Sequence, residues 1–247
     1  MTYPVGTMEN LIPLALPIAI DVVTLSILAV IAARIRLLSP LWAFGLFSLS
    51  MVGGGGVAAL LGGIGALRGG EGSGAALFAA AIGFGCILLV LAIAWGARKA
   101  PAIHDITTDL ADPPPFVVAA QLDANRLRDM SYPDGGPDTA LQQRRAYPDL
   151  APIEVEQPPD EAFAIALRAA AALGWTVTAR DEIAGRFEAT DESAVFRFVD
   201  DIVVRVRPAG TGSVIDARSL SRVGVGDMGI NARRLRAFRE ALPTGRR

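Results

Sequence analysis

The stretch that decides how the second half of this chain folds is DARSLSRVGVGDMGINARRLRAF, at residues 216–238. Its first residues alternate between polar and apolar, its centre is rich in glycine, and its last part repeats apolar residues at helical spacing. Arginine, serine, aspartate and asparagine are dense throughout. We therefore expect a strand–turn–helix unit that closes a folded domain and whose polar side chains have a structural or a binding role.

The residues before this unit predict an antiparallel sheet. Alternating apolar and polar residues indicate strands over 175–180, 185–190, 194–199, 202–207 and 213–218. A short strand over 153–155 and a helix ending at Gly174 precede them, and a helix over 231–242 follows. Residues 116–150 predict an irregular wrap, broken by Pro133, the Gly-Gly-Pro turn at 135–137 and Pro148. The expected class is α+β, with an antiparallel sheet and a closing C-terminal helix.

The first part of the chain is a different kind of sequence. Apolar runs cover about 11–33, 41–67 and 75–97, and each is followed by arginine or lysine. A hydrocarbon core about 30 Å thick is crossed by about 20 apolar helical residues. The first run is too long for a removable signal peptide and lacks a basic leader and a cleavage site. We expect residues 1–100 to form three transmembrane helices, so that the lipid bilayer is one partner of the chain.

Two features of these spans bear on packing. The second and third are rich in glycine and alanine, which lets helices approach closely within one chain or between copies in an oligomer.

Asp21 is the one ionisable residue deep in a span, where a charged group is costly. It is therefore an intramembrane functional candidate. The alternatives are a polar contact with Thr24, Ser48 or Ser50, and a water-lined position.

The sequence between the spans and the domain predicts a tether. Residues 101–116 are polar, acidic and closed by three prolines, which is typical of an extended linker. The expected organisation is thus a membrane region at 1–100, a linker at 101–116 and a soluble domain at 117–247. His104, the only histidine, would lie in that linker, and its spacing from nearby acids matches no metal-ligand motif.

The net charge and the residue composition of the chain argue against several classes of function. The net charge is −2, so nothing indicates the basic surface that nucleic acids require. The only histidine, His104, lies in the expected linker, and the only cysteine, Cys86, lies inside an apolar run. A Ser/His/Asp or Cys/His nucleophile therefore cannot be assembled in the domain. We expect no metal and no cofactor. If there is a reaction, carboxylates or arginines must carry it.

The glycines at 224, 226 and 229 formally satisfy a dinucleotide-binding pattern. No second parallel strand follows the helix, so the βαβ unit that such a site needs is missing. Two interpretations remain. Backbone amides and arginines around the turn could hold an anion. Alternatively, Asp227 braces the start of the helix and pairs with Arg218 or Arg222.

Adjacent acids mark the point between two of the expected strands. Asp200 and Asp201 could share a proton or a cation only if a bulge turned both to one face, and pairing with arginines as turn residues is the alternative. We group them with the arginine–serine signature as one candidate cluster, either ligand-binding or structural. The cluster comprises Asp200, Asp201, Arg205, Arg218, Ser219, Ser221, Arg222, Asp227, Asn231 and Arg234.

These residues resemble the domain-of-unknown-function 1499 family, over about residues 103–242. The resemblance rests on FVDD at 198–201, VVRV at 203–206, RSLSR at 218–222, Gly224, DMG at 227–229, Asn231, Arg234 and Phe238. It is supported upstream by HDITTD at 104–109, two prolines at 113–114, Gln143, YPD at 147–149, Pro152, AF at 162–163 and GW at 174–175. The family implies no reaction.

The resemblance implies a membrane-anchored bacterial protein with its domain outside the cytoplasm. Other members carry a cysteine-containing motif after an export signal, and this chain lacks those cysteines. The basic residues that flank the spans favour a cytoplasmic domain instead. We expect a multi-pass protein of the bacterial inner membrane with a periplasmic domain. The expected function is a non-catalytic envelope module that binds a protein partner or a small anion. The alternative is a carboxylate- or metal-assisted hydrolase or transferase centred on Asp200, Asp201 and Asp227.

Overall fold

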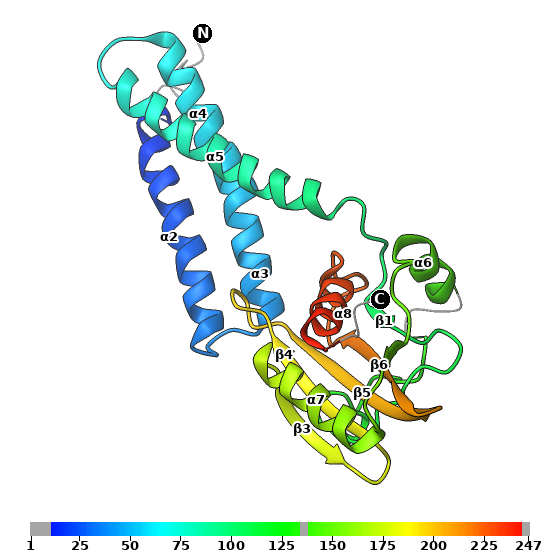
Figure 1. The fold of residues 1–247 in the computed structure, drawn as a ribbon. Helices are drawn as coiled ribbons and strands as arrows, with labels where there is room; N and C mark the ends of the chain where they lie inside the picture. The colour runs from blue at the N-terminus through cyan, green and yellow to red at the C-terminus, as the bar shows by residue number, and fades with distance from the viewer. Residues whose placement is uncertain (1–10, 134–137, 244–247) are drawn as a thin grey trace. The chain divides into compact units, whose positions relative to one another are not determined.

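The computed structural model describes residues 11–133 and 138–243 (Figure 1). They form two compact units: the first comprises the residues up to Ala97 together with Ala194–Arg197, and the second comprises Arg98–Ser193 and the residues from Phe198 on. The expected turn at 135–137 lies outside the described residues, as do both ends of the chain. The first unit is helical, and the second contains the sheet.

Three helices of the first unit are long and apolar enough to cross a membrane, as predicted: Ile12–Arg34, Pro40–Arg68 and Ser73–Gly96. The first consists of a short 3-10 turn, η1 (Ile12–Leu14), and α2 (Ala15–Arg34). The second runs through α3 (Pro40–Leu49), the π-helical segment η2 (Ser50–Gly54) and α4 (Gly55–Arg68), and the third is α5 (Ser73–Ala97).

Helices α4 and α5 approach closely because glycine and alanine face each other. A Cβ atom added to Gly62 would lie 2.5 Å from the carbonyl oxygen of Ala76 and 2.6 Å from the backbone nitrogen of Ala80. A Cβ atom added to the neighbouring Gly63 would meet nothing within 4 Å. The small residues of this face therefore serve packing within the chain.

Asp21 lies on α2 with its side chain exposed, and it makes no hydrogen bond or ion pair with any residue that the structure describes. The hydroxyl of Thr24 donates to the carbonyl of Ile20 at 2.9 Å, and that of Ser50 donates to the carbonyl of Val22 at 3.0 Å. The polar contact of Asp21 with Thr24, Ser48 or Ser50, which was one of the alternatives to a functional role, is therefore not formed.

The second unit is an antiparallel sheet in the strand order β1-β6-β5-β4-β3, with β2 also paired to β6. The strands are β1 (Asp105–Thr107), β2 (Ile153–Val155), β3 (Thr176–Asp181), β4 (Arg186–Glu192), β5 (Val199–Ala209) and β6 (Gly212–Ser221). The other elements are η3 (Ala119–Gln121), α6 (Thr139–Ala146), α7 (Pro159–Ala172) and the closing helix α8 (Ile230–Ala241). The predicted α+β domain with a C-terminal helix is confirmed.

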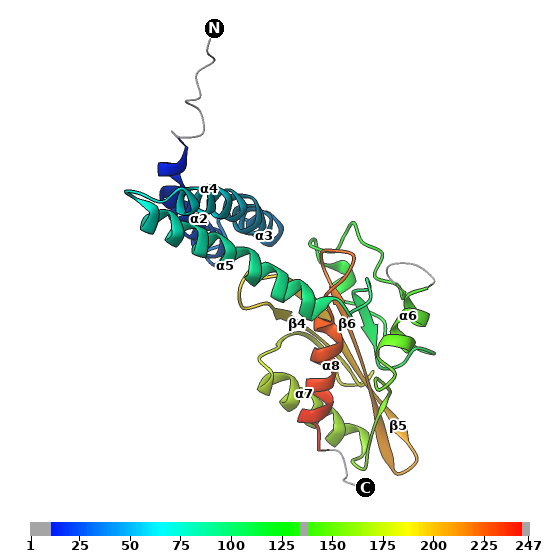
Figure 2. The same ribbon diagram turned by 90° about the horizontal axis from the view of Figure 1, so that it is seen from above.

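Both faces of the sheet are covered. Helices α7 and α8 lie on one face (Figure 2), where the rings of Trp175 and Phe238 stack with centroids 5.1 Å apart. On the other face, residues before α6 pack Phe116 and Met130 against Val203 of β5 and its neighbours. Because successive strand residues point to opposite faces, β5 and β6 are buried on both sides.

The prediction of an extended linker over residues 101–116 is wrong. Strand β1 pairs with β6, with Asp105 opposite Leu220, and Ile103, Ile106 and Phe116 are buried. The acids and prolines suggested solvent exposure. In the folded chain the acids instead meet arginines of the sheet, and this segment forms the second layer of the domain.

Two further predictions need correction. Residues 194–198 are not a strand, because β4 ends at Glu192 and β5 begins at Val199. Asp200 and Asp201 consequently lie within β5 rather than in a turn between strands. The irregular segment 116–150 also contains a helix, α6. The remaining strands and helices agree with the expected ranges within a few residues.

The contrast between two neighbouring glycines gives a test of the helix packing. Gly62→Ala should lower the free energy of unfolding of the full chain in detergent by about 1–3 kcal/mol, because the new methyl meets the backbone of α5 and overpacks the contact. A lower melting temperature would report this loss. Gly63→Ala places the same methyl in open space and should be neutral or slightly stabilising. Equal effects of the two substitutions would contradict this packing.

Candidate functional site

The polar cluster singled out in the sequence is divided between the two faces of β5 and β6. Asp200 pairs across the strands with Ser221, and Asp201 with Leu220, so the adjacent acids point to opposite faces. The face towards α8 carries Asp200, Ser219 and Ser221, which contact Asn231 and Arg234 of α8, while the opposite face carries Asp201, Arg205, Arg218 and Arg222. Asp227 lies in the turn between β6 and α8.

On the α8 face, Arg234 joins the helix to three strands. Its guanidinium donates to Asp200 Oδ2 at 2.6 Å, to Asp191 Oδ2 at 2.8 Å and to Ser219 Oγ at 3.1 Å. Arg234 is 8% exposed. Its charge is therefore met by two carboxylates inside the domain, and the contact fixes α8 against β4, β5 and β6.

Asn231 completes this face. Its amide nitrogen donates to the carbonyl of His104 and to Ser221 Oγ, both at 2.9 Å. Its amide oxygen accepts a hydrogen bond from Ser219 Oγ at 2.7 Å and another from Arg234. Asn231 is fully buried, so the two serines of the signature are partners of α8 rather than of solvent.

Asp227 braces the start of α8. Its carboxylate accepts hydrogen bonds from the backbone amides of Gly229, at 2.8 Å, and Asn231, at 2.6 Å. Burial raises the pKa of this carboxyl, and the two amide hydrogen bonds act in the opposite direction. Of the two interpretations of this turn, these contacts agree with the bracing of the helix by Asp227. The pairing of Asp227 with Arg218 or Arg222 is not formed, because these arginines bind Asp105 and Asp201.

On the opposite face, Arg218 forms a buried ion pair with Asp105 of β1. Two parallel hydrogen bonds of 2.8 Å join Nε to Oδ1 and Nη2 to Oδ2. Arg218 is 1% exposed and Asp105 is 0% exposed. Nη2 also donates to the carbonyls of Met130, at 3.1 Å, and Ser131, at 3.2 Å. The guanidinium lies 4.9 Å from the centroid of the Phe116 ring. One arginine thus ties residues 101–133, which we call the covering segment, to the sheet at several points.

Asp201 anchors a second point of the same segment. It receives a bidentate pair from Arg222, with Nε–Oδ2 at 2.9 Å and Nη2–Oδ1 at 2.7 Å. The side-chain amide of Asn125 donates to Oδ2 at 3.0 Å. Both Asp201 and Asn125 are fully buried. The acid is therefore neutralised and hydrogen-bonded inside the domain.

Glu188 of β4 provides a third anchor. Its carboxylate accepts hydrogen bonds from the backbone amides of Val117, at 2.7 Å, Val118, at 2.9 Å, and Ala119, at 2.6 Å. These amides open the short turn η3 and would otherwise lack partners. Glu188 is 1% exposed, so the covering segment supplies the donors that this buried carboxylate needs.

Two further contacts complete the arrangement. Arg205 and Arg207 both donate to Asp216 Oδ2, at 3.0 Å from Arg205 Nη2 and 2.9 Å from Arg207 Nε. The side chain of Gln143 on α6 accepts from the amide of Thr107 at 3.0 Å and donates to its carbonyl at 2.6 Å. Gln143 therefore occupies the hydrogen-bonding positions of a further strand at the edge of β1.

This geometry limits the chemistry of the cluster. Asp200, Asp201 and Asp227 do not share a site, since the first two lie on opposite faces and the third is occupied by amides. Among the described residues, no group of three histidine, cysteine or acidic side chains is placed to hold a metal ion. An external anion at Arg218, Arg222 or Arg234 would have to displace a bound carboxylate.

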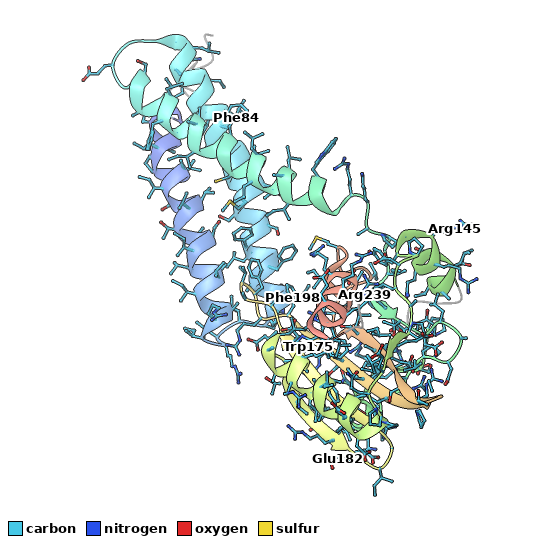
Figure 3. The ribbon with its side chains drawn as sticks, viewed as in Figure 1. Phe84, Arg145, Trp175, Glu182, Phe198 and Arg239 are labelled. Carbon is cyan, nitrogen blue, oxygen red and sulfur yellow. The ribbon has the colours of Figure 1, made fainter. Side chains whose placement is uncertain are left out.

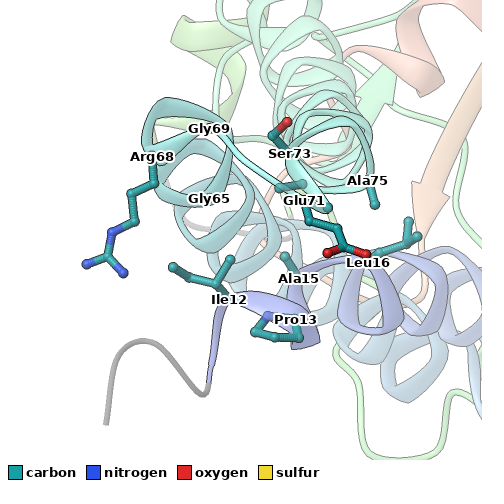
Figure 4. Close-up of a pocket in the computed structure, with 12 residues that line it drawn as sticks. Ile12, Pro13, Ala15, Leu16, Gly65, Arg68, Gly69, Glu71, Ser73 and Ala75 are labelled. Atoms are coloured by element: carbon teal, nitrogen blue, oxygen red, sulfur yellow. The ribbon is translucent and has the colours of Figure 1, made fainter. Parts of the chain in front are cut away.

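The open cavities lie elsewhere. One of about 510 Å³ lies in the helical unit, between η1, the end of α4 and the start of α5, and Leu16 and Glu71 are among its lining residues (Figure 4). Cavities of about 440 and 490 Å³ flank the turn between β3 and β4. None of these three cavities is lined by a residue of the polar cluster.

Sequence reasoning missed the acidic partners of the signature. Asp105, Glu188 and Asp216 are fully buried and hold arginines or backbone amides, but none was singled out as a site residue. Asn125 and Gln143 were missed as well. The available signal was the excess of arginines over acids in residues 216–238, which requires carboxylates from elsewhere in the chain if the arginines are buried.

The structure defines a membrane protein with three candidate spans and an α+β domain. A family profile described as "Protein of unknown function (DUF1499)" matches residues 105–242, which is more than half of the chain. The chain belongs to this family, as the resemblance predicted. The matched region begins at β1 and ends just after α8, so it includes the segment that covers the second face. A comparison with curated proteins finds no match.

The Arg218–Asp105 pair gives a prediction about stability. Arg218→Met or Asp105→Leu alone should destabilise the domain by about 3–5 kcal/mol, because each leaves a buried charge without its partner. The double variant should recover much of that loss. Chemical unfolding of the full chain in detergent measures all three, in a Trp42→Phe, Trp95→Phe background that leaves Trp175 as the only fluorescent tryptophan.

The exposed pair between Arg236 and Asp149 is the control. Hydrogen bonds from Arg236 lower the pKa of Asp149 to about 2, but both side chains are partly exposed. Arg236→Met should therefore change stability by at most about 1 kcal/mol. If Arg218→Met were as mild as this control, Arg218 would not be the buried anchor described above.

Proposed function

We propose that this chain is a multi-pass protein of the bacterial inner membrane whose sheet domain is non-catalytic and binds a protein partner. The observation that carries the proposal is a contrast within the domain. The charges of the signature are paired internally, whereas the cavities on both sides of the β3–β4 turn are open to solvent. The signature builds the domain, and another surface is left for recognition.

The surface in question is the hairpin groove, which we define as these two cavities together with the turn at 182–185. On one side it is lined by Phe163 and Leu167 of α7, and on the other by Val117 and Val118. Ile183 is fully exposed between them, next to Glu182, which lies at the turn (Figure 3). Apolar side chains bordered by charged ones are typical of protein–protein interfaces.

The rim of the hairpin groove favours a protein over a small anion. It contains the acids Asp160, Asp181 and Glu182 and the arginines Arg180, Arg186 and Arg207. Arg186 already contacts Asp181, and Arg207 contacts Asp109 and Asp216. An anion would meet acids beside arginines that are mostly paired, whereas a peptide surface supplies apolar groups and charges of both signs.

The hydrolase or transferase alternative has less support. It required Asp200, Asp201 and Asp227 to act together, and no observation favours that arrangement over their separate structural contacts. The periplasmic placement of the domain is supported by its family resemblance and opposed by the basic residues flanking the spans.

Site-specific photo-crosslinking in cells tests the binding proposal. A photoreactive residue in place of Ile183 should give a discrete adduct, identified by mass spectrometry, and Glu182→Arg should weaken it without changing the amount of chain. Leu141 on α6, which is also exposed, is the matched control position and should give no such adduct.

Adducts that are equal at the two positions, or absent at Ile183, would contradict binding at the hairpin groove. The captured protein also tests the side of the membrane. A periplasmic partner agrees with the proposed placement, and a cytoplasmic partner contradicts it.

A further inference from the structure

The turn between β6 and α8 exposes apolar side chains that the polar signature does not explain. Val223 is 41% exposed, Val225 is 83% exposed and Met228 is 45% exposed. Large side chains at such exposure on one short loop form an apolar surface that water solvates poorly. We call residues 223–228 the apolar turn.

The apolar turn carries no acidic charge on its surface. Its one acid, Asp227, is 6% exposed and holds the amides of Gly229 and Asn231. The neighbouring Arg233 is exposed and donates to the carbonyl of Met228 at 3.1 Å. The outer surface of the turn is therefore apolar with a cation at its border.

The backbone holds this surface in place. Met228 has a φ of 54°, a left-handed conformation that costs a residue with a Cβ atom roughly 1–2 kcal/mol. Asp227 stabilises this conformation by accepting hydrogen bonds from the backbone amides of Gly229 and Asn231, which follow Met228 in the chain. The fold thus keeps Met228 exposed although its backbone conformation is unfavourable, which is typical of functional segments.

The apolar turn is tied to the chain close to the point where the last span ends. A Cβ atom on Gly226 would lie 3.2 Å from Ala102 Cα, and the amide of Asp227 donates to the carbonyl of Ile103 at 3.2 Å. The third candidate span ends at Gly96. At no more than about 3.6 Å per residue, the six residues from Gly96 to Ala102 reach at most about 22 Å.

This reach limits where the apolar turn can lie relative to the membrane. The headgroup layer adds about 5–8 Å outside the hydrocarbon core on each side. The intervening chain carries Arg98 and Lys99, which are attracted to anionic headgroups. Chain length alone keeps the apolar turn within reach of the lipid surface, whatever the orientation of the domain.

We propose that Val223, Val225 and Met228 insert into the interfacial layer of the bilayer in which the chain is anchored. The apolar turn is then a second membrane contact of the protein, made by the sheet domain itself. Val225 inserts most deeply because it is the most exposed. The adjoining cations contact lipid phosphates, and the contact limits rotation of the domain about its connection to the spans.

Fluorescence of the full chain in vesicles tests this proposal. A Cys86→Ala background with Val225→Cys carries a polarity-sensitive NBD label, in vesicles of phosphatidylcholine and phosphatidylglycerol. Leu127→Cys is the matched control, because Leu127 is 90% exposed in another loop of the same domain. The label at 225 should emit at shorter wavelength and be quenched several-fold more strongly by lipids with nitroxide groups near the headgroup.

Two outcomes would overturn the proposal. One is equal, water-like emission and quenching at positions 225 and 127. The other is a shift at 225 that disappears when the protein is diluted in excess lipid, because the turn would then contact a second copy of the chain. Unchanged circular dichroism of the labelled variants shows that the fold is intact, so either result is decisive.

Discussion

The sheet domain depends on the buried ion pair between Arg218 and Asp105. Its partners are separated by 113 residues in sequence, and both are almost completely removed from water. A buried arginine without a carboxylate would be strongly destabilising, so β1 must pair with β6 for the domain to fold. The same guanidinium binds the carbonyls of Met130 and Ser131. Residues 101–133 are therefore a layer of the domain, although the composition of residues 101–116 is that of a linker.

This constraint gives the arginine–serine signature a physical explanation. Arg234 and Asn231 fasten α8 to one face of the sheet, while Arg218 and Arg222 fasten the covering segment to the other. A sheet covered on one side by helices and on the other by irregular chain has many polar backbone groups to satisfy there. Buried side chains such as Glu188 and Asn125 meet that need. Recognition is then expected on surfaces that the network leaves open.

The sequence predicted what local periodicity can encode. The three spans, α7, α8 and most of the strands follow from apolar spacing, and Gly174 takes the positive φ expected at a helix end. Strand β1 has only three residues, and its burial depends on a distant arginine, so no local pattern revealed it. Residues 194–198 alternate like a strand but connect β4 to β5. Residues 194–196 form a turn there, which hydrogen bonds between Ser193 and Phe198 close. The candidate site was found as a set of residues, but its division between two faces was not, since their acidic partners lie far away in sequence.

Hydrogen–deuterium exchange of the full chain in detergent tests the central claim most directly. If the buried ion pairs make residues 101–133 part of the domain, the amides of Thr107, Thr108 and Ala119 should be protected to a similar degree as those of β5 and β6. Each of these amides is buried and hydrogen-bonded. Exchange of these amides at the rate of an unstructured chain, while β5 and β6 stay protected, would show that the segment is a tether and would contradict the account.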